Sequence, residues 1–146
     1  MDRKEFLKTC GFACIGGTAL AALLQGCGTA NYYARANFVD NQIAVKKSEF
    51  IELSSGQSKQ RKYVLVKNDK MGFPICIYKQ SESEFTALYM QCTHKGCELN
   101  PHGDYLVCPC HGSEFTNRGV VQNPPAEENL KTFQIKTDNE NIYVQL

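Results

Sequence analysis

From Gln42 onward the chain is a succession of short apolar stretches. Ile43 and Val45 alternate with polar neighbours, a period of two that is typical of a β-strand with one buried face. No stretch keeps the 3.6-residue period of a long amphipathic helix. Further apolar stretches of strand length lie at residues 50–53, 63–67, 74–78, 84–90, 120–121, 130–135 and 142–146. The pattern therefore predicts an all-β fold.

Turn-forming residues separate these stretches. Residues 68–72, 117–119 and 138–141 are rich in Asn, Asp and Gly, which favour tight reversals of the chain. The last of these turns lies between two alternating stretches, so a closing hairpin is predicted at the C-terminal end. No internal repeat is present.

Residues 1–27 break this pattern. A charged stretch, residues 2–8, precedes a 15-residue apolar run from Cys10 to Leu24. The run is shorter than the about 20 residues that a membrane-spanning helix needs, and it has the length of the apolar part of a signal peptide. Two interpretations remain open for residues 1–26, a cleaved signal peptide and an uncleaved membrane anchor.

Two motifs in this segment favour cleavage. Residues 3–8 resemble a twin-arginine export signal, with Lys4 in place of the second arginine. Residues 24–27, Leu-Gln-Gly-Cys, resemble a bacterial lipobox, in which Cys27 receives lipid and becomes the new N-terminus. Two or more acyl chains anchor a protein stably to a membrane.

The following segment, residues 27–41, has no clean period and is predicted to be a tether. It would join the N-terminal segment to one domain that spans residues 42–146. Its aromatic residues Tyr32, Tyr33 and Phe38 leave two alternatives, a loosely ordered linker and a segment docked on the domain.

The charge balance gives no electrostatic case for nucleic-acid binding. The 146 residues include 16 Lys and Arg against 15 Asp and Glu, for a net charge of +1. Loss of residues 1–26 would remove three basic and two acidic residues and bring the net charge near zero. Attraction of a partner would then depend on local charged patches.

The candidate chemistry is concentrated in residues 92–115. Two boxes there combine thiols with imidazoles: Cys92, His94 and Cys97 in the first, then Cys108, Cys110 and His111 in the second. Thiolates bind iron or zinc, and neutral imidazoles suit either metal. The second box is one residue too short for the C-x-x-C-H attachment site of a c-type haem. A structural zinc site and a Rieske [2Fe–2S] centre, in which two His replace two Cys on one iron, remain.

The spacing inside both boxes resembles the signature of the Rieske iron–sulfur proteins, C-T-H-x-G-C followed by C-P-C-H-G-S. Residues 92–97 and 108–113 match it in full. The resemblance implies an antiparallel β-sandwich with a small cluster-binding subdomain that holds one [2Fe–2S] cluster. The ligands that it implies are Cys92 and Cys108 on the inner iron and His94 and His111 on the outer, more exposed iron.

By the same resemblance, Cys97 and Cys110 would form a disulfide that joins the two loops. Cytosolic Rieske ferredoxins and ring-hydroxylating oxygenases usually lack this pair. The bridged type belongs to quinol-oxidising respiratory complexes and works outside the cytoplasm, where disulfides persist. An iron–sulfur cluster assembled in the cytoplasm must cross the membrane inside a folded protein, which agrees with a twin-arginine signal.

The resemblance also assigns the surroundings of the cluster. Ser113 would donate its hydroxyl to a bridging sulfide. Phe115 stands where high-potential members have a tyrosine that donates to a cysteine sulfur, which implies a lower potential, as for a menaquinone donor. Residues 123–126 resemble the proline loop that covers the cluster with Pro124, although asparagine replaces its usual first glycine.

Lys95 replaces a leucine that quinol-oxidising members of the family usually have at this position. Two interpretations of Lys95 remain open, a solvent-exposed loop lysine and a residue with a role in partner choice.

Two further residues could carry chemistry. Cys76 is either a reactive thiol or a small buried apolar residue, and its apolar surroundings favour burial. His102 lies between Pro101 and Gly103 and is predicted to be a surface-loop residue, not a ligand.

These features predict a membrane-attached electron-transfer protein on the outer, periplasmic face of the bacterial cytoplasmic membrane. The first hypothesis is the Rieske subunit of a quinol-oxidising, bc-type complex, with cytochrome b- or c-type partners and quinol as one candidate donor. Quinol oxidation would then be an activity of the complex, and the chain has no catalytic residue of its own. The second is a subunit or partner of another periplasmic oxidoreductase, similar to arsenite oxidase. The third is a zinc-stabilised binding module without redox activity.

Overall fold

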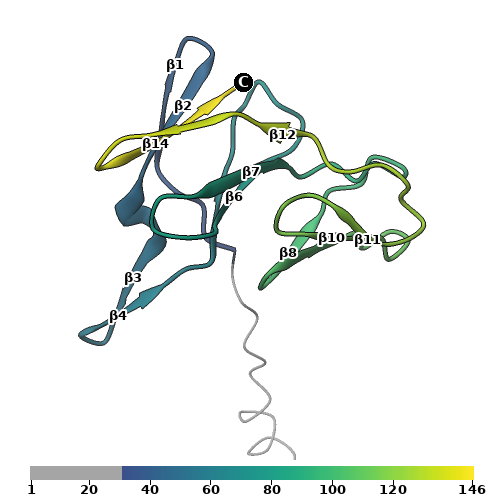
Figure 1. The fold of residues 1–146 in the computed structure, drawn as a ribbon, viewed down its shortest axis with the longest axis horizontal. Coiled ribbons are helices and arrows are strands. Elements are labelled where there is room, and N and C mark those ends of the chain that lie inside the picture. Colours follow the sequence, from purple (N-terminus) through teal and green to yellow (C-terminus); the bar gives the residue numbers. More distant parts are fainter. Residues whose placement is uncertain (1–30) are drawn as a thin grey trace, which may run out of the picture. The chain divides into compact units, whose positions relative to one another are not determined.

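The structure, a computed structural model, describes residues 31–146 (Figure 1). The segment predicted as a signal peptide or anchor, the predicted lipidation site Cys27 and the first residues of the predicted tether lie outside the described residues. Within residues 31–146 the chain forms no helix with the length and apolar character that crossing a bilayer requires.

The described part of the chain consists mainly of strands, with one 3-10 helix, η1, at Lys47–Phe50. The strands are β1 (Ala36–Val39), β2 (Gln42–Lys46), β3 (Ile51–Ser54), β4 (Gln57–Gln60), β5 (Tyr63–Val66), β6 (Ile75–Lys79), β7 (Phe85–Tyr89), β8 (Asn100–His102), β9 (Tyr105–Val107), β10 (Glu114–Thr116), β11 (Val121–Asn123), β12 (Thr132–Phe133), β13 (Ile135–Thr137) and β14 (Asn141–Gln145). All pairings between these strands are antiparallel. The predicted all-β fold is confirmed.

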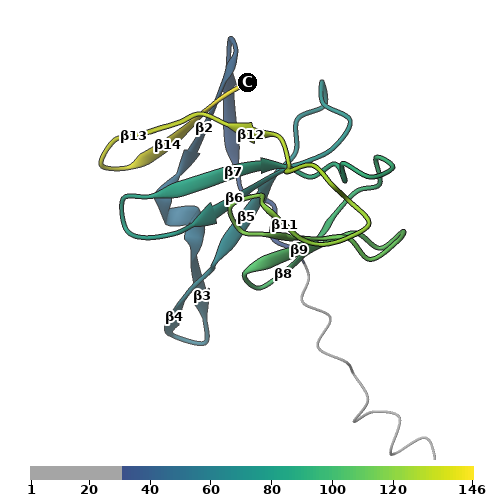
Figure 2. The ribbon, with the colours of Figure 1, turned by 45° about the vertical axis from the view of Figure 1, so that its right-hand side comes forward.

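Three four-stranded sheets and one hairpin make up the fold (Figures 1 and 2). The outer sheet has the order β1-β2-β14-β13, and the middle sheet has the order β12-β7-β6-β5. The loop-side sheet, β11-β10-β9-β8, carries the second cysteine box between β9 and β10. Strands β3 and β4 pair only with each other and project away from the sheets.

The middle sheet separates two hydrophobic cores. In β6, Ile75 and Ile77 pack into the outer core, between the middle and outer sheets. Cys76 and Tyr78, which alternate with them, pack into the loop-side core with residues of the loop-side sheet. Because both faces of the strand are buried, its sequence is a nearly continuous apolar run and lacks the alternation of a half-exposed strand.

Cys76 is fully buried in the loop-side core. Burial raises the pKa of its thiol well above the ordinary value, because the charged thiolate would lose its hydration there. The thiol is therefore a packing group, as predicted, and not a reactive nucleophile.

The C-terminal strands depart from the predicted pattern. Residues 130–135 were expected to form a single strand, but the chain changes sheets at Gln134. Before it, β12 pairs with β7 of the middle sheet; after it, β13 pairs with β14 of the outer sheet. The predicted closing hairpin is therefore β13–β14, and the short β12 belongs to the middle sheet instead.

Residues 31–41 are packed against the domain. The N–H of Leu65 donates to the carbonyl of Tyr32 at 3.0 Å, and the Tyr32 hydroxyl donates to Glu49 at 2.6 Å. Strand β1 pairs along its length with β2. For these residues the docked alternative therefore holds, and the folded unit starts before Gln42, where the domain was expected to begin.

Candidate metal centre

The two cysteine boxes form loops with the same backbone hydrogen-bond scheme. In the first, the N–H of Gly96 donates to the carbonyl of Cys92 at 2.8 Å, and the N–H of Cys92 donates to the carbonyl of Cys97 at 2.8 Å. In the second, the N–H of Gly112 donates to the carbonyl of Cys108 at 3.0 Å. Both glycines have positive φ angles, of 76° and 79°, a region that favours glycine. The repeated scheme holds one cysteine of each loop at an equivalent position.

A hairpin missed in the sequence analysis connects the loops. Strands β8 and β9 pair from Asn100↔Val107 to His102↔Tyr105, and β9 then leads into the second loop. Strand β10 leaves that loop and pairs back onto β9 at Glu114↔Val107. The second loop is therefore the tip of a hairpin and has a firmly paired base.

The thiols of Cys92 and Cys108 are buried side by side. Each residue is only 2% exposed, and the two side chains are close enough for a thiol–thiol hydrogen bond. Burial raises the pKa of the Cys92 thiol, while the backbone N–H groups of His94 and Lys95, which donate to its sulfur, oppose this shift. A bound metal would instead lower the pKa of this thiol, because a coordinating thiol is deprotonated.

The two imidazoles of the boxes lie next to one another. The ring centroids of His94 and His111 are 5.0 Å apart, and the rings are nearly perpendicular, at 85°. Nδ1 of His94 is buried and has no hydrogen-bond partner within residues 31–146. The side chain of His111 is exposed. The structure thus brings the predicted ligands together in two pairs, the buried thiols of Cys92 and Cys108 and the adjoining imidazoles of His94 and His111.

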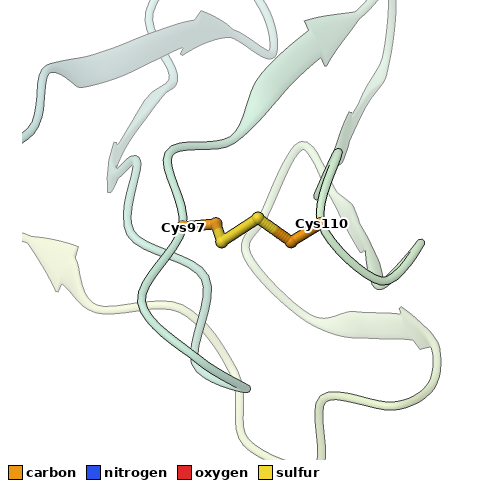
Figure 3. Close-up of a disulfide and its surroundings, with 2 residues drawn as sticks. All are labelled: Cys97 and Cys110. Atoms are coloured by element: carbon orange, nitrogen blue, oxygen red, sulfur yellow. A yellow bond between two sulfur atoms is a disulfide. The ribbon is translucent and has the colours of Figure 1, made fainter.

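The predicted disulfide is present between Cys97 and Cys110 (Figure 3). Their Cα atoms are 6.5 Å apart, and the bond ties the first loop to the second. The sulfur of Cys108 lies within 4.8 Å of both bridged sulfurs. Since the bridged sulfurs are not free thiolates, these three cysteines do not form a metal site by themselves. The thiol of Cys108 remains available as a metal ligand together with that of Cys92.

Comparison with known protein families agrees with this geometry. Residues 41–134 match the model of the Rieske [2Fe-2S] domain, and these residues contain both loops, the disulfide and the proline segment. The chain belongs to the Rieske [2Fe–2S] family. The family assignment favours an iron–sulfur cluster over the zinc site.

Several relatives of this Rieske protein are iron-sulfur subunits of cytochrome b6-f complexes. It is 27% identical over 156 residues to the cytochrome b6-f complex iron-sulfur subunit of Synechococcus sp. (strain CC9605), covering 99% of this chain and 84% of the relative. It is 28% identical over 158 residues to the cytochrome b6-f complex iron-sulfur subunit 1 of Nostoc sp., covering 97% and 83%. Among solved structures, the plasma membrane Rieske protein PetC3 from Synechocystis PCC 6803 superposes with a TM-score of 0.52 at 30% identity, covering 58% of this chain and 87% of that protein.

The residues of the centre fit a Rieske cluster. Two thiols and two imidazoles supply the donor set that such a cluster requires. A buried polar atom without a partner is rare in a folded protein, and ligation would explain the lone Nδ1 of His94. When bound, a cluster with two imidazole ligands supplies one-electron transfer at potentials from about −150 to +300 mV.

The segment predicted as the proline loop is hydrogen-bonded to both cysteine loops. The N–H of Ala126 donates to Oγ of the fully buried Ser113 at 3.0 Å. Oγ1 of Thr93 donates to the carbonyl of Glu128 at 2.7 Å, so the first loop is also tied to this segment. Pro124 itself is exposed. The contacts of Thr93 and Ala126 could not be predicted from the sequence, because a backbone partner leaves no signal in side-chain identity.

The Ala126 contact orients the hydroxyl of Ser113. Because Oγ of Ser113 accepts a hydrogen bond from the N–H of Ala126, the hydroxyl proton of Ser113 is free to be donated to another acceptor. This arrangement suits the predicted donation by Ser113 toward a bridging sulfide.

Phe115 gives a prediction for the redox potential. It is fully buried in the same core as Cys92 and Cys108, as a residue facing the centre must be. The reduced form of the centre carries more negative charge, so a donor there stabilises reduction. A hydrogen bond to a charged group contributes about 1.5–3 kcal/mol, which for one electron is roughly 60–130 mV before solvent screening. We expect Phe115→Tyr to raise the potential by several tens of millivolts in protein-film voltammetry.

A second substitution controls for a change of packing at this position. Phe115→Leu adds no donor and should leave the potential close to that of the unmodified protein. An unchanged or lower potential in Phe115→Tyr would show that residue 115 does not face a cluster sulfur.

The two remaining candidates lie at the surface. Lys95 is exposed beside His94. His102 is exposed at the β8–β9 turn and stacks on Tyr105, with ring centroids 5.9 Å apart. The predicted exposure of His102 is confirmed, but the residue ends strand β8 and does not lie in a loop.

Proposed function

We propose that this protein is the membrane-attached Rieske subunit of a quinol-oxidising complex, passing electrons to a cytochrome. The observation that carries the proposal is the disulfide between the two loops, Cys97–Cys110, next to an exposed imidazole. Rieske proteins with this bridge differ from the cytosolic ferredoxins, as set out above. The relation to cytochrome b6-f iron-sulfur subunits supports the same conclusion.

Within this proposal each side chain of the centre has a role. Cys92 and Cys108 would hold one iron of the cluster, and His94 and His111 would hold the other. His111 is the more exposed imidazole and therefore the point at which a donor or acceptor approaches. Its ring can accept a hydrogen bond from a quinol hydroxyl. This bond holds the quinol in place, and the ring then receives the proton of the hydroxyl. The disulfide keeps the two loops together while a partner binds.

We further propose that the N-terminal segment attaches the protein to the outer face of the cytoplasmic membrane through lipid on Cys27. The resemblance to a plasma membrane Rieske protein supports membrane attachment. The intact mass of the purified protein tests this proposal. We expect a chain that lacks residues 1–26 and carries acyl groups; a full-length chain beginning at Met1 would favour the uncleaved anchor.

The function is tested by reduction with a quinol. Detergent-solubilised membranes should yield a complex in which the protein co-purifies with a b-type cytochrome, and menaquinol should reduce the cluster within that complex. Exposed Lys95 favours the second candidate, a partner of another periplasmic oxidoreductase, because a charge beside His94 disfavours an apolar quinol pocket. Purification with a different oxidoreductase, and no reduction by menaquinol, would establish that second candidate instead.

A further inference from the structure

The β3–β4 hairpin has an apolar face that no part of residues 31–146 covers. Ile51 and Leu53 are two residues apart in β3 and therefore point to the same side. Their exposed fractions are 48% and 84%. Their cross-strand partners on β4, Gln60 and Ser58, are uncharged, and the charged pair of the hairpin lies on the opposite face.

Lysines border this apolar face. Ile51 and Gln60 line a surface cavity of about 410 Å³. The charged residues that line the same cavity are Lys46, Lys47, Lys79, Glu82 and Glu140. Lys79 is paired with Glu82 at 2.6 Å, whereas Lys46 and Lys47 form no ion pair with any carboxylate of the described domain. The cavity thus has two unpaired lysines against one unpaired carboxylate, Glu140, next to the exposed side chain of Ile51.

The base of the hairpin lies where the N-terminal part of the chain joins the domain. The guanidinium of Arg61, directly after β4, stacks 3.8 Å from the ring centre of Tyr32. The hydroxyl of Tyr63 donates to Oδ1 of Asn31 at 3.3 Å. A membrane attachment through the residues before Asn31 would therefore enter the domain beside this hairpin.

The hairpin lies away from the metal centre. In both views, the tip of the β3–β4 hairpin points away from the loops of the loop-side sheet (Figures 1 and 2). A surface bound to the hairpin would leave His111 accessible to a redox partner.

We propose that the β3–β4 hairpin contacts an anionic phospholipid surface. Ile51 and Leu53 enter the interface, while Lys46 and Lys47 meet the lipid phosphates. Aliphatic side chains next to lysines are the combination by which proteins bind at an anionic membrane interface. The contact rests on the membrane attachment proposed above and adds a second, non-covalent site. The charge of the cavity matches lipid phosphate, and the position beside Asn31 favours a membrane over a soluble acidic protein.

Hydrogen exchange in vesicles tests this contact. The protein purified from membranes, with its N-terminal attachment and its cluster, is reconstituted in vesicles of phosphatidylglycerol and phosphatidylcholine, or of phosphatidylcholine alone. We expect the amides of residues 51–60 to exchange more slowly in the anionic vesicles. In the Lys46→Gln/Lys47→Gln variant this protection should fall by about fivefold for each lysine. Leu53→Ser, at a largely exposed position, should also reduce it.

A matched variant separates the contact from general charge effects. Lys67→Gln/Lys136→Gln makes the same charge change at exposed lysines outside the cavity and should keep the protection. Equal exchange in the two kinds of vesicle, with the chain bound, would overturn the lipid contact and leave the membrane attachment standing. Loss of the chain from the vesicle fraction would refute both. An unchanged cluster spectrum in all variants shows that the electron-transfer centre is intact.

Discussion

Cys108→Ala and His111→Ala will each abolish the visible and electron spin resonance spectrum of the Rieske centre. Cys108 is a buried thiol beside Cys92, and His111 is one of two adjoining imidazoles, so either change leaves three donors where the cluster needs four. The measurement is the spectrum together with the iron and sulfide content of the purified protein. We expect both contents to fall to the background level.

The chain offers a matched control for this experiment. His102 is the third histidine, and it is exposed and stacked on Tyr105, away from the paired imidazoles. His102→Ala should keep the full spectrum and iron content. A Rieske spectrum that survives His111→Ala, or disappears in His102→Ala, would overturn the proposed ligand set.

Removal of the disulfide is expected to have the next largest effect. Cys97 and Cys110 are 13 residues apart, and a bridge that closes a loop of about this size contributes roughly 3 kcal/mol in the chain-entropy model. We expect Cys110→Ser to lower the free energy of unfolding by about that amount, measured by urea denaturation. The potential should also fall, because the N–H groups that donate to Cys92 would lose their fixed positions.

A double variant tests whether this effect belongs to the bridge. Cys97→Ser/Cys110→Ser removes the same single bond as either substitution alone, so its cost should match theirs and not be their sum. Reductant should destabilise the unmodified protein to the same level and leave the variants unchanged. Additive costs would assign the effect to packing around the two side chains.

The candidate site could be predicted from the sequence because its information is local. Each loop contains its two donors, its bridging cysteine and a glycine with positive φ within six residues, as in residues 92–97 and 108–113. This spacing can be recognised in the sequence without knowledge of the rest of the fold. The contacts that close the site, Thr93 with Glu128 and Ser113 with Ala126, join residues far apart in the chain and end on backbone groups.

The fold was predictable in its class and less so in its connections. Long apolar runs such as β6 are visible in any sequence, whereas β8 contains a proline and a histidine, and its strand form depends on pairing with β9. At Gln134 the chain leaves the middle sheet and enters the outer sheet, and this change depends on how the two sheets are placed in the fold. The docking of Tyr32 depends on Glu49, a partner 17 residues away.

The position of β6 between two cores limits where the chain can change its length. A single inserted residue would exchange the two faces of the strand from that point on. Cys76 and Tyr78 would turn into the outer core, and the hydroxyl of Tyr78 would lose the carbonyl of Tyr105, to which it now donates at 3.1 Å. The β3–β4 turn, with its exposed Ser55 and Gly56, can take up extra residues without such an exchange. Insertions and deletions are therefore better tolerated in projecting turns such as that of β3–β4 than within β6.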